Sequence, residues 1–158
     1  MYSCAGFVDA TGAADPPRPA AILWNPSSTR SLHIVRSSVA WFRAGSASGA
    51  DFFLARQSSE LAWNSQITVA QQNDSTYDAA PPSGARLDLG MGAGFSTGLV
   101  SAASMFSSGY HSGSGNIGSG WDVPFTEPVR VGPGTGFGWW MRTASHVASF
   151  SITFWWIE

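Results

Sequence analysis

One short string in this chain has the form of a catalytic motif. Gly94-Phe95-Ser96-Thr97-Gly98 matches the G-x-S-x-G turn that presents a nucleophilic serine in α/β hydrolases. That turn needs a strand before it, a helix after it, and an acid and a histidine further along the chain. The sequence shows no such alternation of strands and helices, and it is rich in glycine and serine throughout. We therefore interpret the string as a chance match.

The residue types that hold metals or move protons are scattered. His33, His111 and His146 lack the spacing of a zinc site, which needs three or four converging ligands. The aspartates form no acidic loop of the calcium-binding type, although a calcium site carried on a loop stays open as an alternative. Cys4 is the only cysteine, which excludes an internal disulfide and a cysteine-rich metal site. The sequence predicts no enzyme, no metal and no cofactor.

Composition indicates a surface that another protein covers in part. Charged residues make up 11% of the chain and hydrophobic residues 44%, with eight Trp and ten Phe. The usual charged fraction is about 25%, and exposed aromatic patches mark interfaces. All eight basic residues are arginine, which suits bidentate, partly buried contacts, although genomic base composition produces the same bias.

Nucleic acid and membrane are not expected as partners. The net charge is −2 and the arginines are spread along the chain, whereas phosphate binding needs a basic patch. No apolar run approaches the ~20 residues of a membrane-spanning helix. The first ten residues also lack the basic and apolar regions of a secretory signal.

The stretch from Pro128 to Glu158 has the clearest structural pattern. Near its end, large apolar side chains alternate with others, which is the period of a strand with one face on a core. The core side is Phe150, Ile152, Phe154 and Trp156. The other side ends in Trp155 and Ile157, so we expect it to meet another surface. Residues 137–142 alternate in the same way, and residues 143–146 are expected to join the two strands as a hairpin.

The remaining elements also predict a sheet protein. Short strands separated by Gly, Pro and Asn turns are expected over residues 20–25, 31–43, 51–57, 66–71, 86–89, 121–125 and 128–131. A break at residues 36–38 predicts a bulge or a bend, and residues 107–120 predict an exposed Gly/Ser-rich loop. We predict an all-β fold, an antiparallel two-sheet sandwich of jelly-roll type in one domain over residues 20–158. Residues 1–19 are interpreted as an extended N-terminal arm, because their second half is rich in proline.

Three tryptophans fall on strand faces that would otherwise be polar. Trp24, Trp140 and Trp155 give these strands a second apolar face, which we interpret as a contact between subunits. Trp63 and Trp121 lie in or beside loops, where an exposed ring could stack against a sugar. A sugar-binding module is therefore the alternative interpretation.

Both ends of the chain resemble trimeric jelly-roll proteins of tailed bacteriophages. Residues 23–28 (LWNPSS) and 31–36 (SLHIVR) look like their opening turn and long strand. Residues 128–142 resemble their penultimate hairpin, which is a strand, a Pro-Gly turn and another strand, and the final alternation up to Glu158 resembles their closing strand. The resemblance covers about 45 residues and does not extend through the middle of the chain.

This resemblance implies a tumour-necrosis-factor-like jelly roll that forms a homotrimer. In such proteins a common role is capsid decoration: a cement protein binds the major capsid protein on the outer surface of the virion and has no catalytic residues. The arm is then expected to reach over the capsid or a neighbouring subunit. The expected subunit or capsid contacts are Trp24, Trp140, Arg142, Trp155 and Ile157. Alternatives are a receptor- or carbohydrate-binding module of a phage tail or fibre, with a glycan as partner, and a small glycan-cleaving jelly-roll enzyme.

Overall fold

The computed structural model of the chain describes residues 1–11, 14–43, 50–60, 65–67, 71–72, 81–90, 105–111, 120–143 and 147–158. This part of the chain consists of β-strands and the turns and connections beside them. The eleven strands are β1 (Tyr2–Thr11), β2 (Ala14–Asn25), β3 (Leu32–Arg43), β4 (Ala50–Gln57), β5 (Ser65–Ile67), β6 (Gln71–Gln72), β7 (Arg86–Leu89), β8 (Met105–His111), β9 (Gly120–Val131), β10 (Thr135–Thr143) and β11 (Val147–Ile157). Within these residues there is no helix of the length and apolar character needed to cross a membrane.

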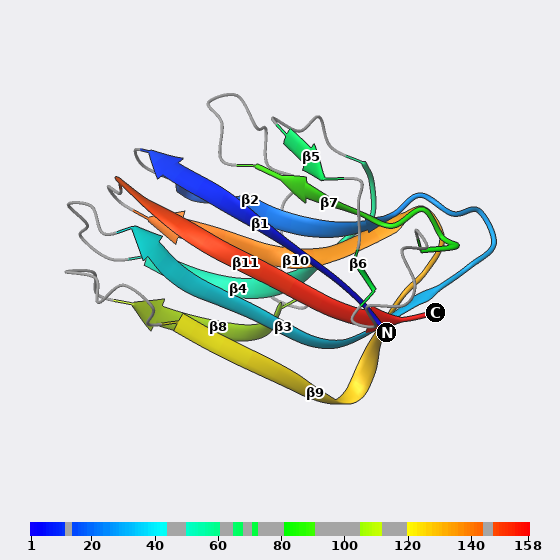
Figure 1. The fold of residues 1–158 in the computed structure, drawn as a ribbon. Helices are drawn as coiled ribbons and strands as arrows, with labels where there is room; N and C mark the ends of the chain where they lie inside the picture. The colour runs from blue at the N-terminus through cyan, green and yellow to red at the C-terminus, as the bar shows by residue number, and fades with distance from the viewer. Residues whose placement is uncertain are drawn as a thin grey trace.

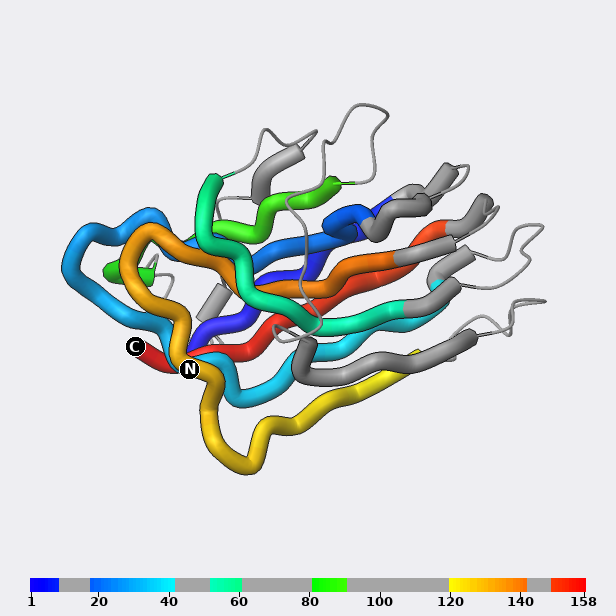
Figure 2. Tube along the Cα trace, turned by 180° about the vertical axis from the view of Figure 1, so that it is seen from behind, coloured from blue at the N-terminus to red at the C-terminus, as the bar shows by residue number. Residues whose placement is uncertain are grey.

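The strands form two antiparallel sheets that face each other (Figure 1). Sheet A has the order β6-β1-β11-β3-β9, and sheet B has the order β5-β7-β2-β10-β4-β8. Figure 2, which views the molecule from behind, shows the strands of sheet B in front of those of sheet A. The predicted all-β fold with two antiparallel sheets is confirmed, and the arrangement is a β-sandwich.

Successive strands of the chain repeatedly change sheet. β9 and β11 lie in sheet A, whereas β10, between them in sequence, lies in sheet B. The predicted hairpin between residues 137–142 and the final strand is therefore wrong, and so is the hairpin that the resemblance implied over residues 128–142. Both segments turn an apolar face to the same core from opposite sheets, so each pairs with strands that are distant in sequence.

The core between the sheets contains the side chains that the alternation predicted. From β11 these are Phe150, Ile152, Phe154 and Trp156, and from β10 they are Phe137, Trp139 and Met141; each is at most 2% exposed. Phe52 of β4 meets Phe150 edge to face at 4.8 Å between ring centroids, which joins the two sheets. Burying one such side chain contributes about 1.5–3 kcal/mol.

A bulge in β3 changes which residues face the core. Leu32 and Ile34 are buried before it, and Val39 and Trp41 are buried after it, so the inward positions change from even to odd. The register with β11 shifts at this point and leaves Val35 as the extra residue. The break predicted at residues 36–38 is confirmed as a bulge, and its extra residue, Val35, lies one position before this range. Its consequence is that Arg36 lies on the side of sheet A away from the core.

The N-terminal residues form strands, and an arm over residues 1–19 is not confirmed. β1 pairs with β11 along its whole length, from Tyr2 opposite Trp156 to Thr11 opposite Val147. Cys4 and Val8 are buried, because alternate residues of β1 point into the core.

The proline-rich residues lie in the first half of β2. Along this half the described ladder partner is β10 alone, since β7 pairs only with residues 21–24. A strand with one neighbour tolerates proline, which has no backbone N–H to donate.

The predicted Gly/Ser-rich loop over residues 107–120 is wrong in part. Residues 107–111 belong to β8, which pairs with β4, and Gly120 begins β9. Pairing with β4 supplies backbone hydrogen bonds whatever the side chains are, so tertiary context overrides the weak strand propensity of glycine and serine. The rest of that segment, residues 112–119, lies outside the described residues.

Asn25 holds together one end of the sandwich. Its side-chain Nδ2 donates to the carbonyl oxygens of Arg30 (2.8 Å), Val131 (3.2 Å) and Gly132 (3.1 Å). Its Oδ1 accepts a hydrogen bond from the backbone N–H of Ser27 at 3.1 Å, the turn that the Asn-Pro sequence predicts. Asn25 is fully buried, and it fixes the β2–β3 connection to the β9–β10 connection.

Candidate interaction surface

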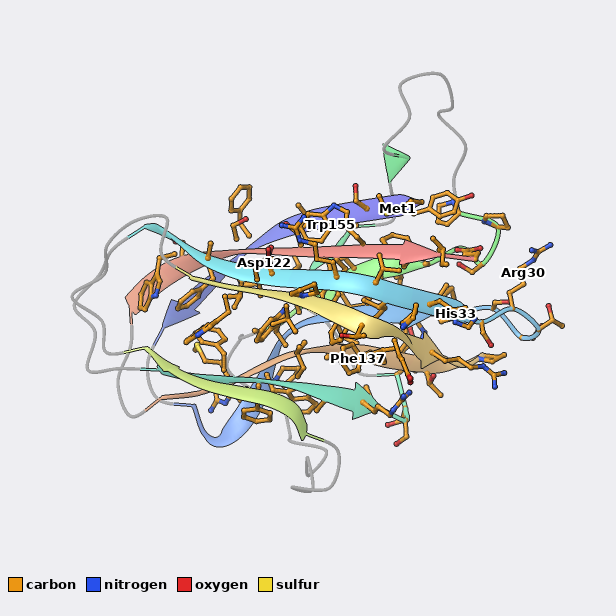
Figure 3. All side chains as sticks on the ribbon, turned by 90° about the horizontal axis from the view of Figure 1, so that it is seen from below. Met1, Arg30, His33, Asp122, Phe137 and Trp155 are labelled. Carbon is orange, nitrogen blue, oxygen red and sulfur yellow. The ribbon has the colours of Figure 1, made fainter. Side chains whose placement is uncertain are left out.

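The side of sheet A that points away from the core is here called the outer face. Strand register places its residues in rows across the sheet, which include Ile157, His33 and Arg130; Ser3, Trp155, Arg36 and Pro124; Ala5, Thr153, Ser38 and Asp122; and Phe7, Ser151, Ala40 and Gly120. Most side chains of the last two rows are small. Figure 3 shows Phe137 between the two layers and Trp155 on the opposite side of β11.

Exposed apolar side chains lie on the outer face. Phe7 is 59% exposed and Ile157 is 43% exposed, and Trp155 is partly exposed. With Met1, Phe7 and Ile157 are the large hydrophobic residues that are exposed within the described part of the chain. Large apolar groups gathered on one face are typical of an interaction site.

Trp155 is joined to two charged residues across three strands. The guanidinium of Arg36 lies over the Trp155 ring, 4.7 Å from its centroid, and makes a cation–π contact. Arg36 also donates from Nε and Nη2 to the two carboxylate oxygens of Asp122, each at 2.7 Å. These hydrogen bonds and the charge of Arg36 lower the pKa of Asp122. The bidentate pair therefore holds the Arg36 guanidinium flat against the indole.

Trp24 and Trp140, predicted as interface residues, are buried within the chain itself. They are 4% and 0% exposed, respectively. Both lie on the side of sheet B away from the main core, where Gly136 provides room for Trp24: a Cβ at this glycine would be 2.9 Å from the indole. Trp140 packs in a separate buried cluster with Ile22, Phe53 and Ala55. On this face the large side chains pack into the space that the glycines leave. Both tryptophans therefore lie outside the proposed interaction surface.

The other three predicted contacts have different outcomes. Trp155 and Ile157 both lie on the outer face, as their alternation with the core residues implied. The backbone of Arg142 is in β10 opposite Asp51, and its side chain lies outside the described part.

Sequence reasoning missed Phe7, Arg36 and Asp122. The alternation of Cys4 and Val8 with Phe7 was a signal for Phe7, but the interpretation of residues 1–19 as an arm concealed it. The pairing of Arg36 with Asp122 joins positions 86 residues apart, and no local pattern reports it.

The candidate catalytic and metal-binding residues are not brought together in the described structure. The Gly94–Gly98 string and His146 lie outside the described residues, His33 is partly buried in β3, and His111 is in β8. Among the described side chains, no group of three or more His, Cys, Asp or Glu residues could hold a metal ion.

One acid in this part is fully buried, and it has a structural partner. Asp88 in β7 accepts a 2.8 Å hydrogen bond from Nε of Arg86, which also forms an ion pair with Glu60. The arginine compensates the buried carboxylate, so we interpret this group as part of the fold.

The described tryptophans offer little surface for sugar stacking. Trp121 is partly buried and lies against Phe52, with ring centroids 5.7 Å apart. Arg36 covers the Trp155 ring, and Trp63 is outside the described residues. Comparison with models of known protein families, with curated proteins and with solved structures finds no match to this chain.

Proposed function

We propose that this chain is a structural protein of a tailed bacteriophage, a capsid decoration protein. In this proposal it forms a homotrimer through the outer face, binds the lattice of major capsid protein on the outer surface of the virion and stabilises the head. The observation that carries the proposal is the outer face itself, on which the apolar side chains of Phe7, Trp155 and Ile157 lie exposed or partly exposed among mostly small residues.

The strand pairing supports a jelly-roll topology of the tumour-necrosis-factor type. Setting aside β5, β6 and β7, which follow one another between β4 and β8, eight strands remain. The first pairs with the last, the second with the seventh, the third with the sixth and the fourth with the fifth: β1·β11, β2·β10, β3·β9 and β4·β8. A long antiparallel ribbon rolled into two sheets has this pairing scheme.

The outer face has the size that a subunit contact needs. Ten residues of β1 pair with β11, and β3 and β9 extend the same sheet. At ~3.3 Å per residue and ~4.8 Å between strands, four strands of this length cover about 600 Å². A stable protein interface buries about 800 Å² per partner, which is of the same order.

A cement role requires binding and no chemistry. A protein that binds only the assembled lattice stabilises that lattice in proportion to the sites it occupies. Three linked copies turn weak contacts with neighbouring capsid subunits into strong overall binding. The half-buried Trp121 and the covered ring of Trp155 favour this role over a sugar-binding module.

The proposal is tested by mixing the purified protein with heads that lack decoration. We expect saturable binding and a higher melting temperature of the heads. Failure to bind heads, together with binding to host cells or glycans, would instead support the receptor-binding alternative.

A further inference from the structure

Three exposed arginines lie at the end of the sandwich where both chain termini are found. Arg30 is in the β2–β3 connection, Arg56 is near the end of β4, and Arg130 is near the end of β9. Nη1 of Arg56 donates to the carbonyl oxygen of Arg130 at 2.6 Å, and Nε of Arg130 donates to the Ser31 hydroxyl at 3.1 Å. These contacts join the three segments into one surface, here called the arginine end. Figure 3 shows Arg30 extending beyond the end of the sheets.

The backbone beneath the arginine end is fixed. Asn25 binds the carbonyl oxygen of Arg30 itself and the carbonyl oxygen of Val131, the residue after Arg130. One buried side chain therefore fixes the backbone at Arg30 and next to Arg130. A surface that is already in place loses less conformational entropy when it binds a partner.

The guanidinium groups of Arg30 and Arg130 have no carboxylate partner in the described part of the chain. The ion pairs described there, at 4.0 Å or less, are those of Arg36 with Asp122 and of Arg86 with Glu60 and Asp88, and none includes Arg30 or Arg130. The Glu158 carboxylate at this end accepts hydrogen bonds from Ser83 and from the indole of Trp156. Glu127 is exposed on β9, three residues before Arg130. The two guanidinium groups therefore keep donors for an outside acceptor, and guanidinium binds carboxylate in a bidentate manner.

We propose that the arginine end docks a carboxylate-rich protein surface, which under the proposed function is the outer surface of the assembled capsid. The whole chain carries a net charge of −2, and phosphate backbones require many more basic contacts than three, so protein carboxylates fit better than nucleic acid. Arg30 lies in the connection beyond the strand ends, and Arg130 lies on the edge strand of sheet A, at the end of the outer face and opposite His33, which pairs with Ile157. A trimer presents three such ends.

The test compares two variants with the wild-type protein. Relative to wild type, R30E/R130E should bind undecorated heads at least about tenfold more weakly, and raising the salt concentration should weaken wild-type binding. E127Q removes an acid from the same end and should bind more tightly. All three proteins should have the same mass by light scattering and the same melting temperature. Wild-type affinity in R30E/R130E would overturn the inference and leave the decoration role intact.

A second probe separates this inference from the proposed function. A surface coated with poly-glutamate should retain the wild-type protein and release R30E/R130E at lower salt. If wild type binds this surface through these arginines and binds no heads, the decoration role fails and the acidic docking end stands. Tighter binding to a DNA duplex than to poly-glutamate would contradict the choice of partner.

Discussion

Trp139 donates its indole N–H to the hydroxyl of Ser37 at 2.7 Å, which joins sheet B to sheet A through the middle of the core. The Ser37 hydroxyl in turn donates to the carbonyl oxygen of Thr153, at 3.1 Å. Ser37 is fully buried, so this one hydroxyl satisfies a tryptophan donor that has no access to water. The two residues are 102 positions apart, and their contact depends on the bulge that turns Ser37 inward.

Replacing Ser37 by alanine should therefore destabilise the fold. The change leaves the Trp139 N–H buried without its acceptor, a loss of about 1–3 kcal/mol. Urea unfolding at a fixed protein concentration measures it. In the double variant S37A/W139F the orphaned donor is gone, so the total loss should be smaller than the sum of the single losses. Simple additivity would show that the hydrogen bond contributes nothing.

Substitutions of Asn25 should show that this residue acts through its amide. In N25D, a carboxylate would face three carbonyl oxygens that now accept hydrogen bonds at 2.8–3.2 Å. We expect N25D to lower the free energy of unfolding by about 2–3 kcal/mol or more at neutral pH, and by more than N25A does. A loss in N25A with little or none in N25D, which keeps an oxygen to accept from the Ser27 N–H, would show that only the turn at Ser27 matters.

The reactivity of the Cys4 thiol tests whether the N-terminal residues form a strand. Burial raises the pKa of its thiol from 9.0 to about 11. At pH 8 the native thiol should react with a soluble disulfide reagent at least about a hundredfold more slowly than the unfolded chain, because the thiolate is the reactive form. Rapid labelling of the native protein would contradict the pairing of β1 with β11.

The raised pKa of the Cys4 thiol also predicts how the free energy of unfolding changes at alkaline pH. The folded pKa lies above the unfolded value, so the folded state holds the proton more tightly between pH 9 and 11. The contribution of Cys4 to stability should therefore be complete below pH 9 and fall as the pH rises through this window. C4A is the control, since it should lose this component of the alkaline dependence.

Substitutions of Trp155 and Ile157 should distinguish an effect on trimer assembly from an effect on folding. Because both point away from the core, W155S/I157S should raise the dissociation constant of the homotrimer by more than about tenfold while the isolated chain stays folded. Analytical ultracentrifugation and circular dichroism measure the two effects. Loss of the folded circular-dichroism spectrum would show that these side chains support the fold instead.

The local alternation of side chains correctly predicted which residues of the last two strands face the core. The inward positions of β10 and β11, the bulge in β3 and the Asn25 turn all follow from short-range patterns. Alternation reports the face of a strand and does not report its partner. For that reason the sequence suggested a hairpin where the chain crosses between sheets.

The remaining differences have the same origin in contacts between distant residues. Proline in β2 and glycine in β8 weaken the local strand signal, and the pairing with β10 and β4 that overcomes it is visible only in three dimensions. Trp24 had the pattern of an interface residue, yet the absence of a side chain at Gly136 lets the indole pack inside the chain. The outer face was located only in part, because Phe7, Arg36 and Asp122 come from three different strands.

The self-association of the outer face is tested most directly at Thr153, in the same row as Ala5 and Ser38. An arginine at this position would project from the outer face into any protein packed against it, while the core side of β11 stays unchanged. Light scattering of the wild-type protein and of T153R gives the answer. The proposed interface predicts a trimer for wild type and a folded monomer for T153R. A monomeric wild-type protein, or a T153R variant that remains trimeric, would contradict it.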